Sequence, residues 1–218
     1  MIKQGSLTPV SRPEEAQAVR RLTPRGAATR ARIVAAALEL MYVKGVNATT
    51  LDDVRAASNT SKSQLYNHFA DKEQLVRAVV AERAVQVLER ERGYLQRLRT
   101  FQGLVRWRNA LVQRNALQSG AYGCGLGSMA SELADQDEVA RATLAESFAE
   151  WEGLLAAGLL RMRESGVLEQ RADPERLATG LMAALQGGYL LAETAHDITP
   201  MEVALDMALD HVRSFLAP

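Results

Sequence analysis

An eight-residue stretch, SKSQLYNH at residues 61–68, gathers side chains suited to binding a polyanion. It opens with four polar residues: Ser61, Lys62, Ser63 and Gln64. At the start of a helix, free backbone amides and the helix dipole attract phosphate. The amide of Gln64 can pair with an adenine edge, and Lys62 can bind guanine or a phosphate. Further polar side chains follow at Tyr66, Asn67 and His68. The stretch therefore indicates contact with DNA.

Two short helices joined by a sharp turn position these side chains. Thr50 is suited to cap the first helix, and Ser61 with Gln64 forms a capping-box pattern that opens the second. Only Ser58-Asn59-Thr60 separates the two, and such a turn is typical of a helix-turn-helix, whose second helix enters the major groove. We expect Asn59 to adopt a positive φ, which Asn tolerates better than most residues.

The rest of the chain predicts an all-α fold. Ala, Leu, Glu and Arg are frequent, and apolar residues recur at spacings of three and four. Gly45 stands where a left-handed helix end is expected, and Asp71 and Thr199 are expected to cap the helices that follow them. Longer helices are expected at residues 24–44, 72–92, 100–118, 137–165, 174–196 and 199–216, and a short one at 128–133.

Charge is unevenly distributed although the net charge is zero. Residues 1–80 hold twelve Lys and Arg against seven Asp and Glu, whereas residues 81–218 hold fourteen against nineteen. A basic end joined to an acidic remainder is typical of a protein with one end at a polyanion. Chance clustering on solvated helix faces would give the same counts.

Several classes of protein find no support in the composition. No segment approaches the roughly 20 apolar residues of a membrane span, and no secretory signal pattern opens the chain. The single cysteine, Cys124, fits a reducing cytoplasm. The three histidines lack metal-ligand spacing, so we expect no metal site and no cofactor. Without a phosphate-binding glycine loop or a nucleophile–base motif, an enzyme or carrier function is not favoured.

Residues 29–80 resemble the N-terminal domain of TetR-type transcriptional regulators. The resemblance rests on TRARIVAAALELMYVKG, TTLDDVRAAS and SKSQLYNHFADKEQL, and the chain departs from the family at Asn59-Thr60, where Gly-Val is usual. Tyr66 and His68 could instead pack on the first long helix. The resemblance implies DNA contacts, mostly to phosphates, at Thr50, Ser61, Lys62, Gln64, Tyr66, Asn67, His68 and Lys72.

The resemblance also implies a division of labour along the chain. We expect a flexible arm at residues 1–22, a DNA-binding domain at 23–70 and an effector-binding and dimerisation domain at 71–218. The protein would then be a homodimer that binds a palindromic duplex operator and leaves it when a small-molecule effector binds. Candidates for the effector pocket are the aromatic, Met and neighbouring apolar residues Trp107, Leu111, Tyr122, Cys124, Met129, Phe148, Trp151, Met182 and Tyr189.

The last two long helices offer apolar faces for a dimer. One face carries Leu177, Leu181, Ala184, Leu185, Tyr189 and Ala192, and the other carries Met201, Leu205, Leu209, Val212 and Leu216. Gly187-Gly188 within the first of these helices suggests a close backbone approach at a helix–helix interface. The alternative is that both faces pack within one chain.

Cys124 supports an alternative mode of regulation. The segment YGCGLGSMASELADQ resembles a junction in a TetR subgroup, some members of which sense oxidants or electrophiles through a cysteine. A thiol ahead of a helix can gain thiolate character from the helix dipole, and a covalent switch at Cys124 is therefore a second hypothesis. The other interpretation of Cys124 is a small buried residue that fills space between two glycines.

Overall fold

The computed structural model describes residues 22–117 and 123–218, and within these ranges the chain forms nine helices and no strand. The predicted all-α class is confirmed. Almost all of the expected arm at residues 1–22, and the pocket candidate Tyr122, lie outside the described residues. The helices are α1 (Pro24–Lys44), α2 (Leu51–Ala57), α3 (Lys62–His68), α4 (Lys72–Leu95), α5 (Phe101–Ala116), α6 (Gly125–Leu133), α7 (Glu138–Glu164), α8 (Pro174–Ala195) and α9 (Thr199–Arg213).

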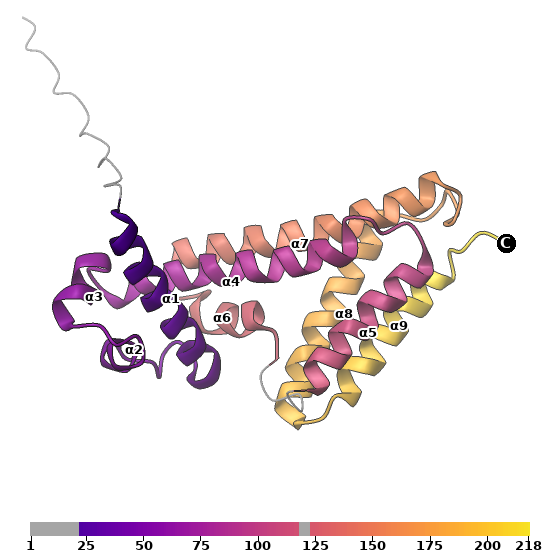
Figure 1. The fold of residues 1–218 in the computed structure, drawn as a ribbon. Helices are drawn as coiled ribbons and strands as arrows, with labels where there is room; N and C mark the ends of the chain where they lie inside the picture. The colour runs from indigo at the N-terminus through magenta and orange to yellow at the C-terminus, as the bar shows by residue number, and fades with distance from the viewer. Residues whose placement is uncertain (1–21, 118–122) are drawn as a thin grey trace, which may run out of the picture.

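The helices form a small head joined to a longer bundle (Figure 1). The head consists of α1, α2 and α3, residues 24–68. Helices α4 and α7 run side by side away from it, and α6 packs on α4 next to the head. At the far end α5, α8 and α9 pack together. One apolar core runs through the described chain from Ile33 in α1 to Val212 in α9, so the head and the bundle share buried surface.

The helix starts of the head follow the predicted local signals. Thr50 and Ser61 both form capping boxes, and the Asp71 carboxylate accepts a hydrogen bond from the Gln74 amide at 2.7 Å. Gly45 has a φ of +85° and Asn59 a φ of +49°, so both chain reversals occur where residue type predicted them.

Two helix starts in the bundle differ from the prediction. Helix α6 begins at Gly125, three residues earlier than expected, which places Cys124 directly at its N-cap. Thr199 is not the cap of α9: it lies inside the helix, and its amide and hydroxyl both donate to the Asp197 carboxylate. The N-cap is Ile198, whose carbonyl accepts from the amides of Met201 and Glu202.

The two apolar faces expected at a dimer interface pack against each other within one chain. Met201 and all of their leucines except Leu216 are buried, and α8 packs against α9. Gly188 explains the close approach, because a Cβ there would lie 2.9 Å from the Cα of Met201. Gly187 faces open space. Most of the side chains expected at a dimer interface therefore belong to the core of a single subunit, whereas Ala184 and Leu216 are half-buried.

None of the described helices combines the length and the hydropathy needed to cross a bilayer. Within residues 22–117 and 123–218, no three His, Cys, Asp or Glu side chains are grouped so that they could hold a metal ion.

Candidate functional site

The first candidate site is the outer surface of α3. Ser61 is its N-cap, and the side chains of Lys62, Ser63, Gln64 and Asn67 are exposed. Leu65 and Phe69 point into the core, being 1% and 2% exposed, and hold the helix on the head. The helix therefore presents its polar face and its N-terminal end to solvent, as a DNA-reading helix requires.

Gln64 is already engaged in the free protein. Its side-chain oxygen accepts a hydrogen bond from the Ser61 backbone N–H at 2.9 Å, and its backbone N–H donates to the Ser61 hydroxyl at 3.2 Å. Pairing with adenine uses both the oxygen and the nitrogen of a glutamine amide. Gln64 must therefore share its oxygen or leave the capping box in order to read a base in this way.

Tyr66 and His68 lie in different surroundings. The Tyr66 ring is 46% exposed, with the Lys62 Nζ 6.0 Å from its centroid, so it is available on the same surface as the lysine. His68 is half-buried at the end of α3, and its Nδ1 is buried with no hydrogen-bond partner among the described residues. The packing interpretation fits His68 better than Tyr66.

Thr50 and Lys72 both have structural partners in the head. Thr50 exchanges two hydrogen bonds with Asp53, and these bonds, ahead of the nearby Lys44, hold the pKa of the Asp53 carboxyl below its usual value. The Lys72 Nζ donates to the carbonyl oxygen of Asn47 at 3.2 Å, which joins the start of α4 to the loop between α1 and α2. The remaining protons of Lys72 are free to meet a phosphate.

The turn of the head also holds a buried polar pair that no sequence pattern predicted. Ser58 and Thr60 are only 2% and 6% exposed, and their hydroxyl oxygens lie 2.8 Å apart. This hydrogen bond closes the turn beneath Asn59. It shows how the turn is stabilised at the point where the chain lacks the usual Gly-Val.

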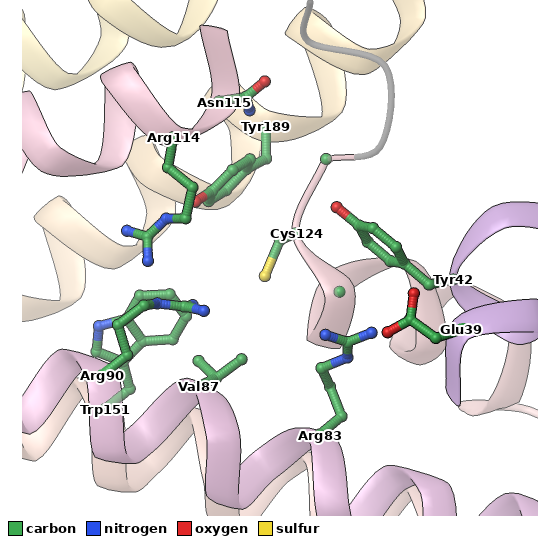
Figure 2. A pocket seen from close by; sticks show the side chains of 12 residues that line it. Glu39, Tyr42, Arg83, Val87, Arg90, Arg114, Asn115, Cys124, Trp151 and Tyr189 are labelled. Carbon is green, nitrogen blue, oxygen red and sulfur yellow. The ribbon is translucent and has the colours of Figure 1, made fainter. Parts of the chain in front are cut away.

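The second candidate site is a cavity of about 270 Å³ lined by side chains of both the head and the bundle, which we call the Cys124 cavity (Figure 2). Of the predicted pocket residues, it brings together Cys124, Trp151 and Tyr189. Phe148 lines a neighbouring, more apolar hollow that shares Cys124 and Tyr189 with the cavity. The remaining described candidates are core side chains outside both: Trp107, Leu111, Met129 and Met182.

Most of the polar wall of the Cys124 cavity was not foreseen. Its cations are Arg83 and Arg90 from α4 and Arg114 from α5, and α1 contributes Glu39 and Tyr42. Figure 2 shows Arg90 and Arg114 on one side of Cys124 and Arg83 with the α1 side chains on the other. Because side chains from the head and from the bundle line the same cavity, its shape depends on how the two regions are placed.

Glu91 fixes one side of this wall. Its side chain is fully buried, and its Oε2 accepts from the indole nitrogen of Trp107 at 2.8 Å. Its Oε1 lies 3.1 Å from the Arg90 Nε and 3.7 Å from the nearest nitrogen of Arg114. Buried charge costs stability unless it is paired and hydrogen-bonded, and Glu91 meets both conditions.

Cys124 is a thiol rather than a thiolate in these surroundings. Burial raises the pKa of its side chain, and the opposing pull of the Gly127 and Leu126 amides at the start of α6 does not offset this. The helix dipole was expected to lower that pKa, but desolvation is the larger effect. The side chain is 7% exposed, as for a small residue that fills space.

Helix α6 connects the cavity with the head. Its N-terminal end carries Gly125 at the cavity wall, and near its C-terminal end Glu132 accepts hydrogen bonds from the amides of Val46 and Asn47, both at 2.9 Å. These amides belong to the loop between α1 and α2. A displacement of α6 at the cavity would therefore move the acceptor of these two amides and disturb the loop between α1 and α2.

Comparison with known proteins bears on both sites. A family model described as "Bacterial regulatory proteins, tetR family" matches residues 33–79. A second, described as "Transcriptional regulator LmrA/YxaF-like, C-terminal domain", matches residues 100–207. The two matches cover most of the head and most of the bundle that follows α4.

Similar proteins include regulators that align with most of this chain. The HTH-type transcriptional regulator LmrA of Bacillus subtilis is 26% identical over 175 residues, 79% of this chain and 90% of that protein. The HTH-type transcriptional repressor DhaR of a Mycobacterium species is 23% identical over 181 residues, with 83% and 90% covered. The fold is similar to that of a TetR regulator from Chloroflexus aurantiacus, with a TM-score of 0.78 at 24% identity, covering 89% of this chain and 100% of that one.

Proposed function

The chain belongs to the TetR family of bacterial transcriptional regulators, and we propose from this premise that it is a homodimeric repressor released from its operator by a small molecule. The family consists of DNA-binding regulators rather than enzymes. We assign operator binding to residues 23–70, and effector binding and dimerisation to residues 71–218. A cytoplasmic location follows from this role, since the operator is on the chromosome.

Operator binding is supported by the exposed polar face of α3. Lys62 and the exposed ring of Tyr66 stand beside the capped N-terminus of the helix, where phosphate is attracted. The excess of cations in residues 1–80 adds a field that favours a polyanion. We assign phosphate contacts to Thr50, Ser61, Lys62, Ser63, Tyr66, Asn67 and Lys72, base reading to Gln64, and a marginal contact to His68.

Dimerisation is supported by apolar side chains that α8 and α9 leave exposed. Leu190 and Leu191 are 61% and 57% exposed on α8, and Val203 and Met207 are 51% and 70% exposed on α9. Clusters of exposed apolar residues mark interfaces in soluble proteins. A two-fold dimer places two reading helices about 34 Å apart on successive turns of a palindrome.

Effector release is supported by the fact that both the head and the bundle contribute side chains to the wall of the Cys124 cavity. This observation carries the proposal. Glu39 and Tyr42 come from the head, whereas Arg83, Arg114 and Tyr189 come from the bundle. A ligand that binds one arrangement of these walls better than another shifts the protein toward that arrangement. Repression, rather than activation, is in keeping with the similarity to the repressor DhaR.

A DNA-binding experiment tests this proposal. The purified protein should select a palindrome from randomised duplexes, and fluorescence anisotropy should show affinity falling steeply as salt rises. Met207→Glu should produce monomers in light scattering and lose the palindrome, because a charge would be buried in the interface. Val139→Glu, an exposed apolar position on α7, is the matched control. Binding that does not depend on salt, or a Met207→Glu protein that remains dimeric, would contradict the proposal.

A further inference from the structure

The Cys124 cavity holds more positive than negative charge. Three arginine side chains line it, and Glu91 pairs with two of them, Arg90 and Arg114. The remaining arginine, Arg83, is attracted through space by Glu39, which is exposed to solvent. Among these five side chains, three cations stand against two carboxylates, and Glu193, whose carboxylate lies beside the cavity residue Gly123, belongs to the neighbouring hollow.

Arg83 is held in place without a strong acceptor. Its Nε and Nη2 atoms are buried with no hydrogen-bond partner in the described part of the chain. The guanidinium carbon lies 4.8 Å from the centre of the Tyr42 ring, and a Cβ at Gly125 would stand 3.1 Å from the Arg83 Nε. An aromatic ring and a glycine therefore fix the side chain by packing, while two donors remain for another molecule.

Burial makes these donors costly to leave unpaired. Desolvation lowers the pKa of the Arg83 guanidinium, which records the same cost, although arginine stays protonated in proteins. A buried donor on a charged group destabilises a protein more than a neutral one does. A carboxylate offers two oxygens in the geometry of a guanidinium edge, so it would satisfy both donors together.

The rest of the wall combines apolar side chains with polar atoms, among them the Trp151 indole nitrogen, which has no hydrogen-bond partner among the described residues. Val87, Trp151 and Tyr189 line the cavity, with Trp151 fully buried. Asn115 is 4% exposed, and its Oδ1 is buried with no partner among residues 22–117 and 123–218, which provides a polar contact away from Arg83. The excess of a single positive charge fits a monoanion better than a phosphate, which carries nearly two charges at neutral pH.

We propose that the Cys124 cavity binds a small organic carboxylate with an apolar body, and that Arg83 is its principal ligand. The inference rests on the proposed function, since it names the chemical class of the effector. It also places the ligand next to Tyr42, so that the anion and the head contact the same side chain.

Matched acids and amides test this inference without DNA. Benzoate, phenylacetate, cinnamate and hexanoate are each titrated beside the corresponding primary amide at constant ionic strength, with calorimetry and tryptophan fluorescence as readouts. At least one acid should bind about tenfold or more tightly than its amide, as expected for a charge-assisted hydrogen bond. Arg83→Gln should weaken that acid by about tenfold or more and leave its amide unchanged.

Two further variants separate binding from folding. Arg141→Gln removes an exposed arginine that pairs with Glu138 on α7, and it should bind the acid as the parent does. Glu39→Gln removes the exposed carboxylate that competes for Arg83, and it should bind the acid several-fold more tightly. A merely structural role for these residues would not produce a gain of affinity.

The outcomes distinguish this inference from the proposed function. Equal binding of acids and amides, unchanged acid binding in Arg83→Gln, or no acid binding at millimolar concentration would overturn the carboxylate assignment. Absence of the gain in Glu39→Gln would do so even if Arg83→Gln failed to fold. Failure to select a palindrome would contradict the proposed repressor function, but it would not change the outcome of the titrations with acid and amide.

Discussion

The head and the Cys124 cavity use polar side chains over different distances along the chain. In the head, the hydrogen bonds that open α2 and α3 join residues three apart, as between Thr50 and Asp53. Behind the cavity wall, the contact of Trp107 with Glu91 spans sixteen residues, and where α6 meets the head, that of Val46 with Glu132 spans eighty-six. The head is therefore specified locally, whereas the cavity exists only after the helices have packed.

This difference decides what the sequence could predict. The N-cap at Thr50, the capping box at Ser61 and the positive φ of Asn59 follow from residue type and spacing, and all three are confirmed. The α9 cap predicted at Thr199 was wrong, because the Thr199 hydroxyl donates to the Asp197 carboxylate instead of accepting from the Glu202 amide. A local signal fails where a neighbouring side chain engages the same group.

One residue in the sequence, Glu91, could have indicated a buried polar network beside the cavity. It stands in the apolar stripe of α4 between Leu88 and Leu95, at a spacing where a leucine or valine is expected. A carboxylate at such a position implies buried partners. Arg83 and Arg90 gave no such signal, because arginines on a long helix are indistinguishable in sequence from a solvated face. The pairing of α4 with α1 and α5 is what turns them inward.

The largest effect should follow from breaking the network at the cavity. Glu91→Ala removes the acceptor of Trp107 and the partner of two arginines, so the free energy of unfolding should fall by about 3–5 kcal/mol. Urea denaturation followed by circular dichroism measures this. Glu91→Gln keeps an acceptor for the indole and should lose less. A loss below about 1 kcal/mol for Glu91→Ala would show that the contact is as weak as an exposed ion pair.

The second effect should appear at the joint between the two regions. Glu132→Ala leaves the amides of Val46 and Asn47 without their acceptor, which should destabilise the protein by about 2 kcal/mol. The head should still bind DNA, while a ligand in the cavity should displace it less, because α6 no longer holds the loop. Anisotropy with operator DNA and the bound acid measures both. Glu138→Ala, an exposed carboxylate on α7, is the control. A full response to ligand in Glu132→Ala would remove α6 from the coupling path.

A third experiment separates local capping from base reading in the head. Gln64→Ala should relax the preference for one base in each half-site, with a loss of about 1–3 kcal/mol in binding. Ser61→Ala breaks the same capping box and should cost about 1 kcal/mol of stability, with base preference kept. Selection on randomised operators compares the two variants. If both relax the same base, the box positions the helix and Gln64 does not read DNA itself.

The smallest effect concerns two glycines that show the same contrast within the bundle. Gly93 is an exposed position within α4, and a Cβ added there would meet no atom within 4 Å, so helix propensity alone should decide the effect of substitution. Gly93→Ala should stabilise the protein by about 0.5–1 kcal/mol, which urea denaturation can resolve. Gly188→Ala makes the same chemical change in α8, but its methyl group would meet the Met201 Cα at 2.9 Å and should destabilise the protein. Opposite signs would show that a residue in the bundle obeys local rules only where no distant residue touches it, and equal signs would remove that distinction.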